Sequence, residues 1–414
     1  MKQICDKEYC TACSACYNIC PKHAISMIEE NQVGYVYPRI DSSKCVDCKL
    51  CERICPVNNP LVKKKPLQAF AAICKDSESL DKSASGGAAS TIARAVIESG
   101  GIVYGCRMNS YTDIVHERFA TIHDMYAMRG SKYVQSKIGE VYRQVREDLH
   151  AGWVVLFTGT ACQVGGLRNY LRKEYDNLYC MDLVCHGVPS QKLLRDDIEY
   201  MFYKRNLKTN GTERVTFRKI LSDQTSNLDL RFGTFVEGAI PIADQMFLKN
   251  NYITAFMMGL TFRENCYHCP YACKERVSDI TVADFWGYKG AKIPSGKGIS
   301  LILSSTVKGQ ELVKMIQTKM NIEERPIKEA IAGNGQLQHP STRPIERELF
   351  LTEYEKHGVY VYTSLLKKYR RKYKWGSYKN YVIRRLRENH YSYIVLKFMY
   401  TKLRKLIINQ SKCY

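Results

Sequence analysis

Cys10-Thr-Ala-Cys13-Ser-Ala-Cys16-Tyr-Asn-Ile-Cys20-Pro21 decides the N-terminal fold, and its spacing returns at Cys45-Val-Asp-Cys48-Lys-Leu-Cys51-Glu-Arg-Ile-Cys55-Pro56. Two-residue gaps let three thiolates of one tight loop reach three irons of a 4Fe–4S cube, and the fourth cysteine, followed by proline, ligates the other cube. The repeat therefore predicts two clusters. The first is held by Cys10, Cys13, Cys16 and Cys55, and the second by Cys20, Cys45, Cys48 and Cys51.

A zinc site is the alternative interpretation of these cysteines, because Cys-x2-Cys pairs also bind zinc. Zinc sites with four cysteines usually draw their ligands from two pairs. Each run here instead has three close cysteines followed by a Cys-Pro step, which favours iron and sulfide. Cys5 lies outside the repeat and is interpreted as a spare thiol.

Apolar segments beyond Lys63-Lys64-Lys65-Pro66, which is a predicted linker, alternate between strand and helix patterns. Strands are expected at 68–74, 102–106, 153–158, 178–184, 279–284 and 300–305. Helices are expected at 88–99, 138–150, 163–173, 191–205 and 310–320. This alternation predicts an α/β body in which helices cover a sheet.

The expected organisation is a multidomain chain of the α+β and α/β classes. A small two-cluster ferredoxin domain covers residues 1–61. The body covers 68–350, with an N-terminal part at 68–150 and a C-terminal part at 151–350, and a basic helical tail covers 363–414.

Cysteine content and the start of the chain bear on its location. The 414 residues include 18 cysteines, and Met1–Cys5 leads into the cluster motif without the apolar region of a signal peptide. No apolar run has the ~18 residues of a membrane-spanning helix. We therefore expect metal rather than disulfides and a cytoplasmic protein.

Positive charge is concentrated in the predicted tail. The formal net charge is +21, and residues 363–414 contain fifteen Lys or Arg against one acid, Glu388. Residues 391–408 have amphipathic helical spacing, so one interpretation is contact with an anionic membrane surface. Docking on the protein's own body or on a partner is the alternative. No nucleic-acid-binding motif supports a role in binding nucleic acid.

Four further cysteines stand in unusual contexts. Cys162 and Cys185 each follow a buried strand, and Cys266 and Cys269 form a Cys-x2-Cys pair. Neighbouring strand ends of a parallel sheet meet at one edge, so these four thiols form a candidate third 4Fe–4S site. The alternative is that Cys162 and Cys185 are buried core thiols and that the Cys266–Cys269 pair binds zinc or has no ligand. Cys273 is a rival candidate for the fourth ligand.

Two small-residue turns are candidates for binding a pyrophosphate. Ser85-Gly86-Gly87 precedes a predicted helix, and Thr158-Gly159-Thr160 joins a strand to a helix. Backbone N–H groups in such turns face anions, although plain N-caps have the same composition. Lys132 and Tyr133 lie in a polar loop and are candidates for contact with a flavin ring.

Several motifs together resemble the beta subunit family of coenzyme F420 hydrogenases and dehydrogenases, over roughly residues 68–305. They are Thr158-Gly-Thr-Ala-Cys-Gln163, Asp182-Leu-Val-Cys-His-Gly187, Cys266-Tyr-His-Cys269 and Ser278-Asp-Ile-Thr-Val-Ala-Asp-Phe-Trp-Gly287. Members of this family bind FAD and a 4Fe–4S cluster, and the type members reduce F420. Others reduce chlorophyll intermediates or occur in surface-polysaccharide gene sets.

The resemblance implies a third cluster on Cys162, Cys185, Cys266 and Cys269. It also implies FAD near Ser85, Gly86, Gly87, Lys132, Tyr133, Thr158, Gly159 and Thr160. Ala161 stands where the family commonly has proline, and Cys273 where it usually has no cysteine.

The expected function is that of an iron–sulfur flavoprotein oxidoreductase. Iron–sulfur clusters exchange one electron at a time, whereas hydride transfer moves two. A flavin can accept two single electrons and then donate a hydride. The expected partners are a redox protein and a small-molecule substrate, either an F420-like coenzyme or another compound. An electron-transfer adaptor without a substrate site of its own is the alternative.

Overall fold

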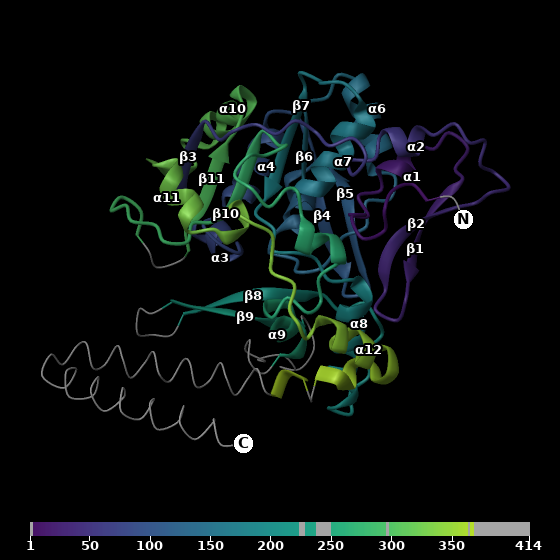
Figure 1. Ribbon diagram of the computed structural model, residues 1–414. Helices are drawn as coiled ribbons and strands as arrows, with labels where there is room; N and C mark the ends of the chain where they lie inside the picture. Colours follow the sequence, from purple (N-terminus) through teal and green to yellow (C-terminus); the bar gives the residue numbers. More distant parts are fainter. Residues whose placement is uncertain (1–2, 223–227, 237–249, 295–297, 363–364, 368–414) are drawn as a thin grey trace, which may run out of the picture. The chain divides into compact units, whose positions relative to one another are not determined.

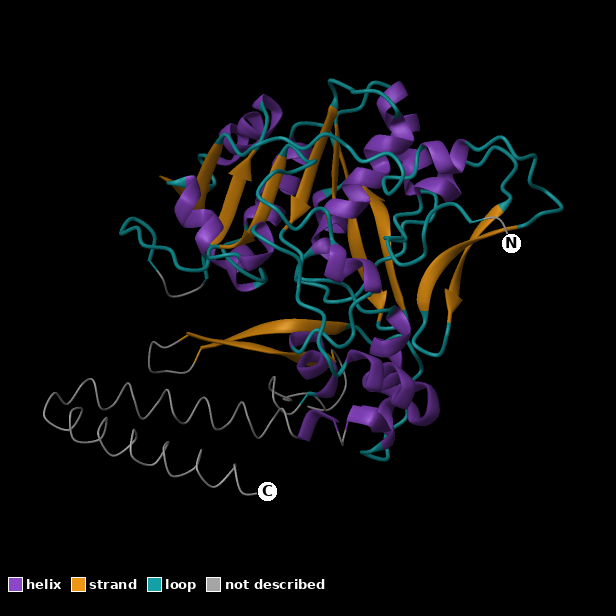
Figure 2. Cartoon of the chain, viewed as in Figure 1, coloured by secondary structure: helices purple, strands orange, loops and turns teal. Residues whose placement is uncertain are grey.

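A large mixed sheet organises the chain, whose structure is a computed structural model (Figures 1 and 2). The structure describes residues 3–222, 228–236, 250–294, 298–362 and 365–367. The chain divides into two compact units, Met1–Val359 and Tyr360–Tyr414. The predicted basic tail, apart from 365–367, lies outside the described residues.

The strand order of the large sheet is β12-β3-β11-β10-β7-β6-β4-β5. Its strands are β3 (Gln68–Cys74), β4 (Ile102–Ser110), β5 (Asp113–Phe119), β6 (Val155–Thr160), β7 (Leu178–Leu183), β10 (Ile280–Asp284), β11 (Ser300–Ser304) and β12 (Met320–Arg325). The four central strands from β10 to β4 run parallel, and the flanking strands pair antiparallel. The mixed α/β architecture is thus confirmed, with β5 and β12 as strands that the sequence pattern did not predict.

Side chains alternate between two cores along each central strand, as the period of two in a strand requires. In β6, Val155 and Phe157 face the core that α6 (Val141–His150) and α7 (Ala161–Leu171) cover. Leu156 faces the opposite core, which α4 (Ala88–Glu98) and α10 (Val307–Ile316) cover. Helices therefore lie on both faces of the sheet (Figure 2).

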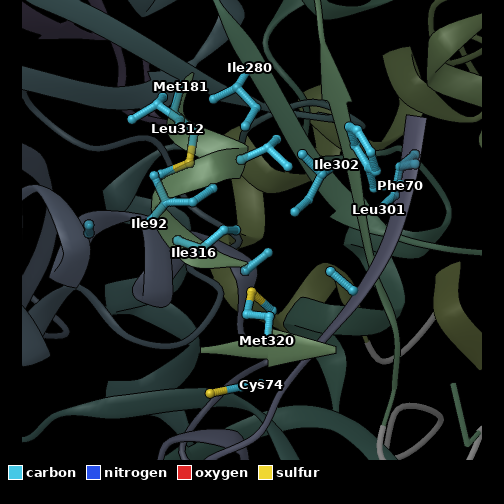
Figure 3. Packing of buried hydrophobic residues seen from close by; sticks show 14 of the residues in the cluster. Phe70, Cys74, Ile92, Met181, Ile280, Leu301, Ile302, Leu312, Ile316 and Met320 are labelled. Atoms are coloured by element: carbon cyan, nitrogen blue, oxygen red, sulfur yellow. The ribbon is translucent and has the colours of Figure 1, made fainter. Parts of the chain in front are cut away.

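Figure 3 shows the second of these cores. Ile92 of α4 and Leu312 and Ile316 of α10 lie on the same side of β11 as Ile302, and all four are fully or almost fully buried. Burial of one such side chain contributes roughly 1.5–3 kcal/mol. Exposed ion pairs contribute about 0–1 kcal/mol, so packing rather than surface charge holds the layers together.

The remaining described elements of the body form two groups: short helices around the large sheet, and a second group of helices with one hairpin. The short helices around the sheet are α3 (Ser77–Asp81), α5 (Ile122–Met125), α11 (Ile327–Ala332), η1 (Tyr126–Met128) and η3 (Gly335–Leu337). The second group comprises α8 (Gln191–Tyr203), the hairpin β8 (Val215–Ser222) and β9 (Leu228–Val236), α9 (Asn251–Met257), η2 (Glu264–His268) and α12 (Arg347–His357); η4 (Gly358–Tyr360) follows.

The N-terminal region repeats in backbone conformation as well as in sequence. It consists of α1 (Ala15–Ile19), the hairpin β1 (Ile25–Glu30) and β2 (Tyr35–Ile40), and α2 (Leu50–Arg53). Ala12 and Ser14 in the first loop have φ of 52° and 64°, and Asp47 and Lys49 in the second have 55° and 58°. These left-handed residues turn each loop so tightly that three cysteines converge. The predicted domain boundary between 61 and 68 falls inside the first compact unit and stays a prediction.

Helix α7 begins two residues earlier than its sequence pattern predicts. Thr160 and Gln163 form a capping box, in which each side chain bonds the other's backbone, so the helix starts at Ala161. Cys162 consequently lies in the first turn of α7. Among the described residues, no helix combines the length and apolar character needed to cross a bilayer.

Candidate functional site

The cysteines predicted to hold the first cluster line one cavity. They are Cys10, Cys13, Cys16 and Cys55, and each is less than a tenth exposed. Cys10, Cys13 and Cys16 come from the loop around α1, whereas Cys55 follows α2. The crossing of the two motifs, in which the fourth cysteine joins the other set, is therefore present in the structure.

Cys5 also lines this cavity, although its position outside the repeat suggested a spare thiol. Its thiol lies within hydrogen-bonding reach of the sulfurs of Cys10 and Cys55. This contact is the largest cause that lowers the pKa of Cys10 to about 6 and that of Cys55 to about 7. The first site thus has a fifth sulfur that favours ionised ligands.

The second set of cysteines lies nearer the surface. Cys48 is exposed, while Cys20, Cys45 and Cys51 are half-buried. Cys20 and Cys51, which come from different motifs, pack against the same small apolar cluster. Residues of the two motifs therefore also meet in this second region, which is more exposed to solvent than the first site.

The four cysteines of the candidate third site converge on a further cavity. Cys162, Cys185, Cys266 and Cys269 all line it, and none forms a disulfide. Burial, followed by repulsion from another cysteine of the set, raises the pKa of Cys162 to about 11 and that of Cys266 to about 12. Burial also raises the pKa of Cys185 and Cys269. Such thiols ionise when an iron centre draws off their protons, so the donor set fits a cluster.

Strand topology explains how two distant cysteines meet. Strands β6 and β7 are parallel neighbours, with Thr160 opposite Leu183 at their carboxyl ends. Cys162 follows β6 in the first turn of α7, and Cys185 follows β7 by two residues. Ligands bind at such strand ends in open α/β sheets, which is why the sequence pattern located this pair.

A buried ion pair fixes the floor of the third site. Arg276 lines the cavity and lies 3.0 Å from Asp182, with both side chains almost fully buried. Arg276 also donates to the carbonyl oxygens of Tyr271 at 2.7 Å and Leu183 at 3.3 Å. Removing one partner would leave the other charge buried and uncompensated, which typically costs about 3–5 kcal/mol. The pair therefore ties the Cys269 segment to the end of β7.

Cys273, the rival fourth ligand, does not line this cavity. Its thiol lies 3.1 Å from the carbonyl oxygen of Glu275, to which it donates, and Lys63 Nζ lies 3.4 Å from its sulfur. The geometry accordingly favours Cys269 as the fourth member of the set.

A larger cavity, of about 340 Å³, adjoins the third site and contains most residues predicted to bind FAD. Those lining it are Ser85, Gly87, Lys132, Tyr133, Thr158, Gly159 and Thr160. Its volume lies in the range of cofactor pockets, which are about 300–1,000 Å³. Gly86 lies behind the wall, where an added Cβ would meet Ala72 O at 2.3 Å, so its lack of a side chain serves the packing of the turn against the sheet.

Lys132 and Tyr133 hold the wall of this cavity in different ways. The Lys132 ammonium donates to the carbonyl oxygens of Met128 at 2.6 Å and Arg129 at 2.9 Å, and burial lowers its pKa. The ring of Tyr133 packs against Phe256 at 4.9 Å between ring centroids. Lys132 thus secures its own loop, and Tyr133 gives the cavity an aromatic side.

A buried polar network shapes the Thr158–Thr160 turn. His116 Nε2 contacts Thr158 O at 3.0 Å, its Nδ1 contacts Ser136 Oγ at 2.9 Å, and Gln163 donates to Ser136 at 3.1 Å. Burial lowers the pKa of His116 to about 4, so it is neutral at neutral pH. The network keeps the turn open toward the cavity, and nothing in the sequence around His116 indicated this role.

A separate cavity of about 210 Å³ lies beside the first turn of α4, where Ser90 and Thr91 line it. Its wall carries the cations Lys75, Arg94, Arg129 and Lys319 against one acid, Asp76. Arg129 belongs to the walls of both cavities. This basic setting suits phosphate groups.

Other residues on the larger cavity escaped sequence analysis. Arg218 of the β8–β9 hairpin forms an ion pair at 3.0 Å with Asp284, and both line the cavity. Trp286 lines it as well and is 49% exposed. A lone arginine in a polar strand carries no recognisable signal, so Arg218 could be found only from the fold.

The two cysteine-lined cavities and the larger cavity have wall residues in common. Thr11 lines both the first cysteine site and the third. The third site shares Thr160 and the segment Cys185–Val188 with the larger cavity. The sites therefore form one continuous series from the N-terminal loop to the carboxyl edge of the sheet.

Comparison with known proteins identifies two segments of the chain. Residues 9–59 match the family model for the 4Fe-4S dicluster domain. Residues 154–330 match the family model for the C terminus of the coenzyme F420 hydrogenase/dehydrogenase beta subunit. No curated protein matches the chain.

Among solved structures, a matching chain comes from the F420-reducing [NiFe] hydrogenase complex from Methanosarcina barkeri. It is 18% identical, and the match covers 66% of this chain and 93% of that chain, with a TM-score of 0.42.

Proposed function

The chain joins a 4Fe–4S dicluster domain to a domain of the coenzyme F420 hydrogenase/dehydrogenase beta subunit family, and from this premise we propose that it is an iron–sulfur flavoprotein oxidoreductase. It transfers electrons between its N-terminal clusters and a small-molecule substrate at a bound FAD. The substrate is an F420-like coenzyme or another hydride acceptor or donor.

The shared walls carry this proposal. Thr11 separates the first site from the third, and the Cys185–Val188 segment separates the third site from the larger cavity. Electron transfer requires redox groups in close succession with little intervening water, and this series provides it. A chain that only bound structural clusters would have no need of a cofactor-sized cavity against the third set of cysteines.

FAD would supply the step between single-electron and hydride chemistry. Ser85, Gly87 and Thr158–Thr160 line its proposed cavity, and Tyr133 and Trp286 offer aromatic surface beside it. The neighbouring cations, Arg129 among them, suit its phosphates. Arg218, held at 3.0 Å from Asp284, places charge on the wall where a substrate would meet the flavin.

The third cluster would be held by Cys162, Cys185, Cys266 and Cys269, which are buried or half-buried and line one cavity. Four thiols without a disulfide support this assignment. The second N-terminal set, with Cys48 exposed, is the proposed point of contact with a partner redox protein.

Anaerobic purification with iron, sulfide and flavin quantification tests the proposal. We expect about twelve irons, four for each of three cubes, and one FAD per chain. Cys269→Ser should lose about four irons, and FAD should no longer be reduced through the remaining clusters. Cys273→Ser, in the same segment, is the matched control and should retain them all. About eight irons without flavin would instead indicate an electron-transfer adaptor.

A further inference from the structure

Arg263 is a fully buried arginine that reaches from the third site to the first. It lies three residues before Cys266, and its backbone N–H donates to Val188 O at 3.1 Å on the shared wall of the third site. Its guanidinium crosses to the N-terminal region, where Nη2 donates to Cys10 O at 3.0 Å and Nη1 to Val36 O at 2.9 Å. One residue thus contacts both sites, the third through its backbone N–H and the first through its guanidinium.

No carboxylate pairs with Arg263 among the residues that the structure describes. Its other neighbours are neutral: Nε donates to Asn265 Oδ1 at 3.3 Å, and the guanidinium lies 4.7 Å from the ring centroid of Tyr37. The buried arginines Arg276 and Arg168 pair with Asp182 and Asp279, respectively, whereas the buried Arg347 donates to the carbonyl oxygens of Leu260 and Phe262 and to the Tyr35 hydroxyl. A buried cation without a carboxylate is unfavourable unless some other anion compensates it.

The cysteine sulfurs on either side are the anions that face this cation once they ionise. In the first site, the guanidinium lies against the backbone of the ligand Cys10, with Nη2 3.0 Å from the carbonyl oxygen of Cys10. Toward the third site, Nε lies 3.3 Å from Oδ1 of Asn265, the residue directly before the ligand Cys266. Its charge therefore acts on both sets of ligands.

We propose that Arg263 is a positioning residue that raises the reduction potentials of the first and third clusters together. A cube gains one negative charge when it accepts an electron, and a fixed cation nearby stabilises that reduced state. Because Arg263 lies between the two sites in a dry interior, its effect is weakly screened and common to both. Both potentials therefore shift in the same direction when the charge at residue 263 is changed. The third-cluster half of this inference rests on the proposed function.

The second N-terminal cluster is an internal reference. Arg263 makes no hydrogen bond to any of its four cysteines, and those cysteines lie nearer the solvent. Its potential should therefore be insensitive to a change at residue 263, whereas a general loss of folding would disturb all clusters alike.

Redox titration of the anaerobic holoprotein, followed by electron paramagnetic resonance, tests the proposal. Arg263→Met should shift the potentials of the first and third clusters downward and leave that of the second unchanged. Arg263→Lys keeps the charge and should keep both potentials near their original values. If the methionine variant does not retain iron, Arg263→Gln removes the charge while preserving a donor.

Arg347→Met is the matched control. Arg347 is equally buried and donates to Phe262 O, one residue before Arg263. Its guanidinium lies 5.7 Å from the ring centroid of Tyr267 in the third site, but its hydrogen bonds go to Leu260, Tyr35 and Phe262 and not to the first cysteine loop. Its replacement should lower stability and leave the potential of the first cluster in place. Unchanged potentials in an iron-replete Arg263→Met protein would overturn the proposal, as would equal shifts in the lysine variant or an equal shift of the first cluster in the Arg347→Met variant. If iron analysis finds no third cluster, the proposed function fails, while the shift at the first cluster remains measurable.

Discussion

The two cysteine loops of the N-terminal region have the same spacing and the same left-handed turns, yet they face different surroundings. In the first, Ala15, Cys16 and Asn18 of α1 are buried, and Cys13 packs in the core formed by α6 and α7. In the second, α2 has no buried residue, and Cys48 is exposed.

Contacts with the body account for the difference. Asn18 donates to Gly139 O at 2.8 Å, and Arg143 of α6 donates to Asn18 O at 2.9 Å. The second loop is held by its own neighbours, for example Asn59, which donates to Arg53 O at 2.8 Å. A symmetric motif has thus become an inner site that belongs to the body and an outer site that a partner can approach.

Removing one ligand from each loop should give the largest contrast. Cys13→Ser and Cys48→Ser should each lose about four irons. Cys13→Ser should also lower the melting temperature of the whole unit substantially, because its buried site is part of the main core and metal binding contributes to folding. Cys48→Ser should change the melting temperature little. Anaerobic thermal unfolding with iron analysis measures both, and equal losses would show that the inner loop is no more integrated than the outer.

A smaller effect is expected where the inner loop contacts α7. An added Cβ at Gly166 would lie 2.8 Å from Cys13 Cβ and 2.9 Å from Tyr142 Oη. Overpacking of this kind destabilises by about 1–3 kcal/mol, which exceeds the ~1 kcal/mol that alanine gains over glycine in a helix. Gly166→Ala should therefore lower the free energy of unfolding and speed iron loss to a chelator.

Gly335→Ala is the control for that substitution, since a Cβ there meets nothing within 4 Å. Its unfolding midpoint in urea should match that of the unaltered protein. If the Gly166→Ala protein has the same midpoint as the unaltered protein, the Cys13 loop can move away from α7 at little cost, and the close packing between them does not contribute to stability.

The smallest effect should come from an arginine at the outer loop. Arg53 donates to Cys48 O at 2.9 Å, much as Arg263 donates to Cys10 O, but Arg53 is exposed. Arg53→Met should lower the potential of the second cluster only slightly, and the shift should vanish at about 1 M salt, where the Debye length is about 3 Å. Redox titration at two salt concentrations decides this. A shift as large as that of Arg263→Met would contradict the distinction between wet and dry sites.

Local pattern predicted the central strands and the gathering of Cys162 and Cys185, because both follow from burial and from parallel topology. Strand β3 was predicted with its observed bounds, and helix α10 was displaced because Thr306 caps it and Met320 already begins β12. The edge strands β5 and β12 were missed, since half-exposed strands with charged residues lack a continuous apolar run.

Long-range packing left no local signal. Three contacts join segments that are far apart in sequence. Cys13 packs against Gly166, Arg263 donates to Cys10 O, and Cys5 lines the first cysteine site. Each involves a residue type whose usual role is different: a helix glycine, a lone arginine and a cysteine outside its motif. Only the fold assigns them to the sites.

Helix α7 contacts both the first and the third cysteine sites. Helix α7 carries Cys162 in its first turn and receives the Cys13 loop at Gly166, four residues later or about 6 Å along its axis. The spacing of the proposed first and third clusters would thus follow from the rise of a single helix. Movement of the 62–67 connection would leave this part of their spacing unchanged.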